Sequence, residues 1–111
     1  MQYMLMICAD DSFVPPEGLD EETAAWVEEM DGRGVRLSGD RLRPPGDATT
    51  VRVRDGELMV SDGPFAETKE QMAGYDLIEA GDLDEAIAVA AAHPMARRGT
   101  VEVRPVWPFS G

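Results

Sequence analysis

The densest group of reactive side chains lies in the middle of the chain, in the stretch DGPFAETKEQMAGY that covers residues 62–75. Asp62 opens an Asp-Gly-Pro turn, which is stiff because the aspartate bonds to the backbone and the proline fixes the next dihedral angle. Phe65 would make the wall of a neighbouring pocket apolar and anchor the loop in the core. The same residues also suit an ordinary surface turn. The motif therefore predicts either a catalytic carboxylate, acting as general acid or base, or a turn alone.

Charged and phenolic groups follow this turn. Lys69, between Glu67 and Glu70, can hold an anionic substrate or orient Asp62, and the alternative is a solvated connection. Tyr75 stands at the start of an apolar run, where it is a candidate proton donor or a core aromatic. We therefore take Glu67 and Lys69 as candidate substrate contacts and Tyr75 as a candidate catalytic residue.

Two further candidates lie near the C-terminus. His93 is the only histidine in the chain. It stands at the end of a predicted helix, where the helix dipole favours its cationic form, so it is a candidate acid or base with a structural role as the alternative. Arg104 shares one face of the last predicted strand with Glu102, which predicts an ion pair across the sheet or the dimer interface, or else an anion clamp for a substrate.

The residue types and motifs of the chain predict no metal site and no cofactor. One histidine and one cysteine, Cys8, stand far apart and match no zinc-binding spacing. The chain has no glycine-rich phosphate loop, nucleophile elbow or dinucleotide fingerprint.

Composition limits the classes of partner and location. The 111 residues suit a single domain, residues 1–111, and carry a net charge of −12, which disfavours nucleic acid. No apolar run approaches the ~20 residues that span a bilayer, and the start of the chain does not resemble a signal peptide. With Cys8 as the only cysteine, no internal disulfide can form, and we expect a cytoplasmic protein.

The elements that must position the candidates follow from periodicity and turn signals. Asp20 is the expected N-cap of the first helix, and Asp82 that of the second, which Pro94 ends. We expect the apolar face of the second helix at Leu83, Ala86, Ile87, Ala90 and Ala91. In chain order, the predicted elements are a strand (2–8), a helix (20–30), a strand (35–42), a hairpin (49–61), a strand (73–80), a helix (82–93) and a strand (99–107).

The hairpin has the most specific local pattern. Two alternating runs flank Asp55-Gly56, the preferred pair for a two-residue type I′ turn. This turn places Val53 opposite Leu58 and pairs oppositely charged residues next to the turn.

Without the hairpin, the order is β-α-β-β-α-β, which predicts an α+β fold of the ferredoxin-like kind. Right-handed crossovers place both helices on one face of the antiparallel sheet. The other face then exposes Met4, Met6 and either Leu77 or Ile78, so we expect a homodimer in which a second copy covers it.

The central motif, DGPFAETKEQ followed by Gly74-Tyr75, resembles the signature of the DGPF-domain, YCII-related family. MQYMLMI, TTVRVRDGELMVSDGPF, DLDEAIAVAAAHP and VEVRPV extend the likeness over nearly the whole chain. The resemblance implies a ferredoxin-like protomer that pairs into a dimeric α/β barrel.

The family's reference chemistry is dehydrochlorination of chlorinated hydroxyquinols, with a histidine on the first helix paired to an aspartate in the cleft. This chain has Ala24, Ala25 and Trp26 near that position, so only the aspartate, as Asp62, has a counterpart. DGPF members also resemble proteins encoded beside extracytoplasmic-function sigma factors.

Two functions remain open. The first is a cofactor-free lyase or hydrolase for a small polar organic molecule, with Asp62, Tyr75 and His93 as catalytic residues. Phe65, Glu67, Lys69 and Arg104 would then contact the substrate. The second is a non-catalytic dimer that binds a ligand or serves as a regulatory accessory. The missing helix histidine favours the second function, and the concentration of polar groups in one loop favours the first.

Overall fold

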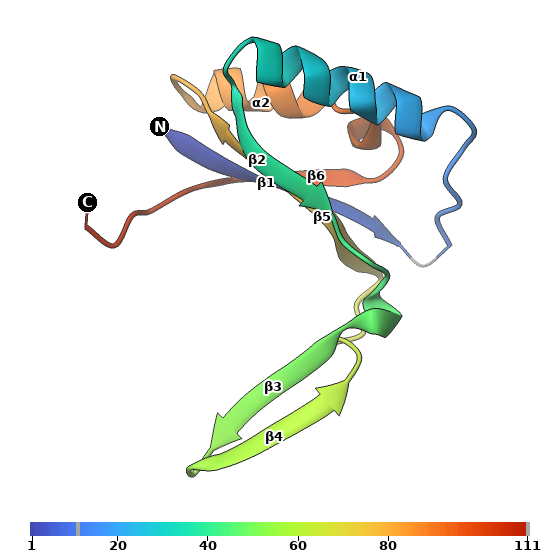
Figure 1. Ribbon diagram of the computed structural model, residues 1–111, viewed down its shortest axis with the longest axis vertical. Coiled ribbons are helices and arrows are strands. Elements are labelled where there is room, and N and C mark those ends of the chain that lie inside the picture. The colour runs from blue at the N-terminus through green and yellow to red at the C-terminus, as the bar shows by residue number, and fades with distance from the viewer. Residues whose placement is uncertain (11, 111) are drawn as a thin grey trace.

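The computed structural model describes residues 1–10 and 12–110. Four strands form the main sheet in the order β2-β5-β1-β6, and two more form a separate ribbon (Figure 1). The elements are β1 (Gln2–Asp10), α1 (Leu19–Gly32), β2 (Arg36–Arg41), a short 3-10 helix η1 (Pro45–Asp47), β3 (Thr49–Arg54), β4 (Glu57–Asp62), β5 (Glu70–Glu79), α2 (Leu83–Ala92), a second 3-10 helix η2 (Pro94–Arg97) and β6 (Thr100–Pro105).

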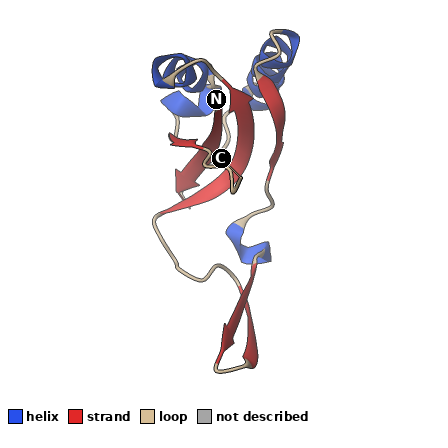
Figure 2. Cartoon of the chain, turned by 90° about the vertical axis from the view of Figure 1, so that its left-hand side faces the viewer, coloured by secondary structure: helices blue, strands red, loops and turns tan. Residues whose placement is uncertain are grey.

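The expected ferredoxin-like α+β fold is confirmed. All neighbouring strands of the main sheet are antiparallel, and the long β1 and β5 occupy its centre. Both helices cover the same face of this sheet, and the opposite face carries no helix (Figures 1 and 2). A bulge between Ile7 and Cys8 shifts the register of β1 against β5. In the described part of the chain, no helix is long and apolar enough to cross a membrane.

The core lies between the sheet and the two helices. Tyr3, Leu5 and Ile7 alternate onto the helix-covered face of β1 and are buried. Trp26 of α1 packs onto this layer from above, and its indole nitrogen donates to the carbonyl oxygen of Val89 in α2 at 3.1 Å. This bond ties the two helices together while satisfying the indole group.

The helix-free face carries the other side chains of the central strands. Met4 and Met6 are half-buried there, and the register places Leu77 beside Met4. Of the two residues left open by the sequence, it is Leu77 that lies on this face. Ile78 is fully buried beneath the helices.

The first helix begins earlier than expected, whereas the second begins where it was expected. Gly18, with φ 88°, is the N-cap of α1 in place of Asp20, so the helix starts at Leu19 and Asp20 is its second residue. Asp82 caps α2 as expected, accepting a bond from the Glu85 N–H at 2.8 Å. The Glu85 carboxylate accepts in turn from the Gly81 N–H at 2.9 Å.

The expected apolar face of α2 is only partly right. Ala86 and Ala90 are buried, whereas Leu83 and Ile87 are about half exposed and Ala91 is exposed as well. Val89, which the spacing did not single out, is buried instead. The face that meets the sheet is therefore rotated from the one inferred by periodicity.

The hairpin is confirmed in position and register. Val53 pairs with Leu58 and Arg54 with Glu57. Asp55 and Gly56 both have positive φ, 53° and 77°, as a type I′ turn requires. The two strands form a ribbon that extends away from the main sheet (Figure 1).

Candidate functional site

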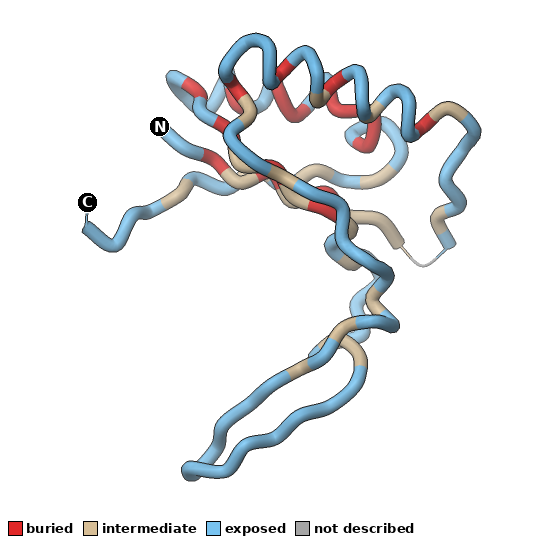
Figure 3. Tube along the Cα trace, viewed as in Figure 1, coloured by how far each residue is buried: buried red, intermediate tan, exposed pale blue. Residues whose placement is uncertain are grey.

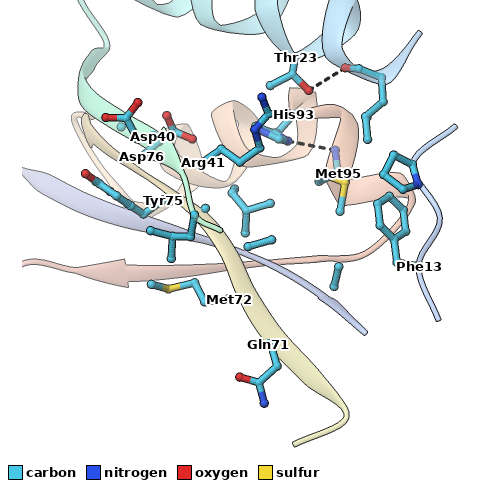
Figure 4. Close-up of a pocket in the computed structure, with 18 of the residues that line it drawn as sticks. Phe13, Thr23, Asp40, Arg41, Gln71, Met72, Tyr75, Asp76, His93 and Met95 are labelled. Carbon is cyan, nitrogen blue, oxygen red and sulfur yellow. Dashed lines mark hydrogen bonds between the residues drawn. The ribbon is translucent and has the colours of Figure 1, made fainter. Parts of the chain in front are cut away.

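A cavity of about 710 Å³ lies between α1, β2 and the helix-covered face of the sheet (Figure 4). Much of its wall is apolar, with contributions from Ile7, Phe13, Leu19, Val27 and Met95. Its size falls within the range of about 300–1,000 Å³ that is typical of small-molecule sites. A few polar side chains interrupt this wall, and they decide what the cavity can bind.

In the described part of the chain, His93 is one of two buried polar residues in the cavity wall, and Asp76 is the other. It ends α2, and its Nδ1 accepts a hydrogen bond from the Met95 N–H at 3.0 Å. An accepting Nδ1 carries no proton, so the neutral ring holds its proton on Nε2. The ring also packs edge-on against Trp26, with 4.7 Å between centroids. These contacts hold the ring in one orientation.

The Nε2–H of His93 is available to a ligand. Within residues 1–10 and 12–110, no protein group accepts from this nitrogen, and no side-chain nitrogen or oxygen is both enclosed and unpartnered. Nε2 therefore reaches the cavity that the residue lines. It offers one directed hydrogen-bond donor in a largely apolar wall.

Burial keeps this histidine neutral. Desolvation lowers the pKa of His93 from 6.5 to about 4. The expectation that the helix dipole would favour the cation is wrong, because loss of hydration in a site that is 4% exposed outweighs the dipole. At neutral pH the ring is a hydrogen-bond donor and a weak base.

Asp76 and Arg36 form an ion pair at another part of the wall. Arg36 Nε donates to Asp76 Oδ1 at 2.8 Å, and its two terminal nitrogens donate to Gly39 O at 2.7 Å and to Asp31 Oδ1 at 3.2 Å. Burial raises the pKa of Asp76, while the bond from Arg36 opposes that rise. Because all three guanidinium nitrogens donate hydrogen bonds, Arg36 holds the Asp76 carboxylate and the backbone of β2 at Gly39 in place.

A second, exposed ion pair links the helix to the sheet beside the cavity. Arg41 of β2 donates to Asp20 of α1 at 3.2 Å, and both side chains are more than three-quarters exposed. Such a pair contributes only about 0–1 kcal/mol, so it opens at little cost. Both residues line the cavity and can separate to admit a ligand.

Of the candidates chosen from sequence, His93 and Tyr75 border this cavity. Tyr75, however, pairs with Met6 in the sheet register, which places its ring on the helix-free face. In Figure 4 the ring points away from His93. The structure therefore brings one of the three expected catalytic side chains, His93, into the cavity.

Asp62 and Phe65 lie elsewhere. Asp62 ends β4 opposite Thr49, where it is exposed and outside the lining of the cavity. Phe65 is 78% exposed, so the expectation that it anchors its loop in the core of the chain is wrong. The reason is the ribbon itself, which carries this loop away from the sheet (Figure 3).

The remaining candidates are also outside the cavity lining. Glu67 and Lys69 are exposed in the connection before β5. Lys69 helps to lower the pKa of Asp10, for which hydrogen bonds from Ser12 are the main cause. Arg104 lies 3.9 Å from Glu102 of the same strand, an exposed contact on the helix-free face.

Sequence reasoning missed Asp76, Arg36, Arg41 and Thr23, which also line the cavity. Asp76 had a readable signal, because it occupies a core position of β5 two residues before the buried Ile78. A charged residue at such a position requires a partner. The partner is 40 residues away in sequence and could not be read from spacing.

Comparison with known proteins places the chain in a family. The family model described as the YCII-related domain matches residues 1–110. An uncharacterized protein, R00369 of Rhizobium meliloti (strain 1021), is 42% identical over 103 residues, which cover 76% of this chain and 82% of that protein. The resemblance read from the DGPF motif is thereby confirmed, and the chain belongs to the YCII-related family.

Proposed function

We propose that this protein binds a small, largely apolar organic molecule in the cavity beneath α1, with a hydrogen-bond acceptor of the ligand facing His93. The observation that carries the proposal is the buried imidazole, held as a donor by the Met95 N–H in the wall of a cavity of about 710 Å³. A ketone, ester or ether oxygen suits a neutral N–H donor, and apolar walls favour a hydrocarbon body.

Binding without catalysis is the better supported of the two classes. A general base works best with a pKa near the operating pH, and burial lowers that of His93 to about 4. Asp76 is held by Arg36, and Asp62 stands on the ribbon. Among residues 1–10 and 12–110, no pair of acid and base at a shared reacting atom supports a lyase or hydrolase reaction in this cavity.

The binding proposal is tested with acetophenone and with ethylbenzene, which resembles it but has no carbonyl oxygen. Trp26 reports on the cavity through its indole N–H signal in NMR spectra, because its ring packs on His93. Trp107 is 90% exposed and serves as the internal control. We expect acetophenone to shift the Trp26 signal with a Kd on the order of 1 mM, and ethylbenzene to bind about fivefold more weakly for lack of one hydrogen bond.

A matched pair of variants locates the site. Val27→Phe places a ring in the cavity that Val27 lines, and we expect it to weaken acetophenone at least tenfold. Val14→Phe makes the same change at a position that is 80% exposed and should leave binding unchanged. The proposal fails if acetophenone leaves the Trp26 signal unmoved, or if Val27→Phe binds as well as the wild type.

We further propose that the protein acts as a symmetric homodimer and forms an α/β barrel through the helix-free sheet faces. The half-buried Met4, Met6 and Leu77 support this, because a second copy would remove them from water. Light scattering at micromolar concentration should give twice the chain mass of 12.1 kDa. A folded monomer under these conditions would overturn the dimer.

A further inference from the structure

The β3–β4 ribbon has one apolar face and one polar face. Val53 pairs with Leu58 and Val51 with Val60, so these four side chains project on the same side. We call them the apolar ribbon face. Each of the four is between 58% and 64% exposed. Arg52, which pairs with Met59, projects on the opposite side together with Arg54 and Glu57.

Nothing in the described part of the chain covers this face. The two strands pair only with each other, and the ribbon extends beyond the main sheet (Figures 1 and 2). Apart from the intermediate Thr50, every residue of the two strands is exposed, and Figure 3 shows the ribbon exposed along nearly all of its length. The radius of gyration is 15.9 Å, against about 13 Å for a compact domain of this length. A two-stranded hairpin alone is marginally stable in water, so the ribbon requires a surface to pack on.

We infer that the apolar ribbon face docks on a second copy of this chain, so that each subunit extends an arm onto its partner. The chain itself carries a second uncovered apolar surface, the helix-free sheet face, and the ribbon points away from the body that carries it (Figure 2). The apolar ribbon face and the helix-free sheet face do not meet within one molecule. When two copies associate around a two-fold axis, both surfaces can be covered at once.

The distribution of charge favours a second copy of this chain as the partner, and the ribbon as the surface that meets it. The whole chain has a net charge of −12, and α1 contributes acidic residues with no lysine or arginine. Two copies therefore repel each other through their helices. The ribbon balances Arg52 and Arg54 against three carboxylates. It is thus a part of the surface that can approach a second acidic copy with little repulsion.

The test compares two double variants of the ribbon. Val53→Lys with Leu58→Glu places an ion pair on the apolar ribbon face and keeps a favourable cross-strand pair. Arg52→Lys with Met59→Glu creates the same pair on the opposite face, at the next position along the ribbon. By sedimentation equilibrium, we expect the first variant to raise the dimer Kd about a hundredfold or more, and the second to change it less than about threefold.

Contact between the ribbon and the second copy is measured on the wild type. The result therefore does not depend on whether the variants fold. In an equal mixture of isotope-labelled and unlabelled protein, we expect intermolecular methyl NOEs from Leu58 and Val53, with none from the core residue Leu5. A dimer that shows such NOEs from Met6 but none from Leu58 would overturn the arm and leave the sheet-face dimer standing. A wild type that stays monomeric, or a first variant that dimerises as tightly as the second, would also overturn the arm.

Discussion

Removing Arg36 should destabilise the protein strongly at neutral pH, because it leaves the Asp76 carboxylate without its cation. Asp76 is 6% exposed and accepts the Arg36 Nε–H at 2.8 Å. Losing one partner of a buried pair costs about 3–5 kcal/mol. We therefore expect Arg36→Met, which keeps most of the side-chain volume, to lower the free energy of unfolding by roughly 3 kcal/mol near pH 7.

The control is an exposed pair on the same side of the molecule. Arg33 contacts Glu29 at 3.4 Å, and both side chains are more than half exposed. Pairs of this kind contribute about 0–1 kcal/mol. Arg33→Met should therefore change the unfolding free energy by less than about 1 kcal/mol, measured by urea denaturation at the same protein concentration.

The pH dependence identifies the cause. Burial raises the pKa of Asp76, and Arg36 opposes that rise, so removing the arginine raises the pKa further. For an acid whose folded pKa is raised, ionisation costs stability above that pKa, and the cost disappears below the unfolded value. The difference between Arg36→Met and the wild type should therefore shrink as the pH falls from about 7 to about 4, because the raised pKa of Asp76 favours its protonated form in the folded protein. A penalty below about 1 kcal/mol, or one that is the same at both pH values, would refute the reasoning.

Three further predictions follow from the described side chains. The lowered pKa of His93, from 6.5 to about 4, should reduce stability by about 3 kcal/mol as the pH falls through this window, because the unfolded chain takes up the proton first; NMR titration of the ring should give a midpoint near 4, and one near 6.5 would contradict the burial. Gly56→Val should cost about 1–3 kcal/mol in urea denaturation, since φ is 77° there, whereas Gly56→Asn should cost much less; equal costs would exclude the type I′ turn. Gly39→Ala should cost about 1–3 kcal/mol, because its methyl group would lie 2.6 Å from Tyr75 O, while Gly32→Ala, with open space around it, should be neutral, and the same thermal midpoint for both variants would contradict the close packing.

The elements with local signals were predictable from sequence. The hairpin follows from Asp55-Gly56 and the alternation beside it, because turn type and register are set by neighbouring residues. The order of strands and helices follows from periodicity, and right-handed crossovers then place both helices on one face. The N-cap Asp82 was readable for the same local reason, and the DGPF motif was enough to identify the family.

The candidate site was predictable only in part, because its members come together from distant segments. His93 was singled out as the one histidine, but its neutral state depends on burial by packed helices. Phe65 suggested an anchor by its residue type, whereas the outward course of the ribbon leaves it exposed. The type of a residue alone does not determine whether its side chain is buried in the folded protein.

The sequence by itself determined the fold class, the hairpin register and the family, since periodicity, turn residues and motif spacing are local properties of the chain. The tertiary structure decided which polar groups share a cavity. The Arg36–Asp76 pair joins positions 40 residues apart, and the His93 ring that accepts from the Met95 N–H lines a cavity only because α1 and the sheet enclose it. Desolvation and hydrogen-bond geometry depend on surroundings that exist only after the segments have packed.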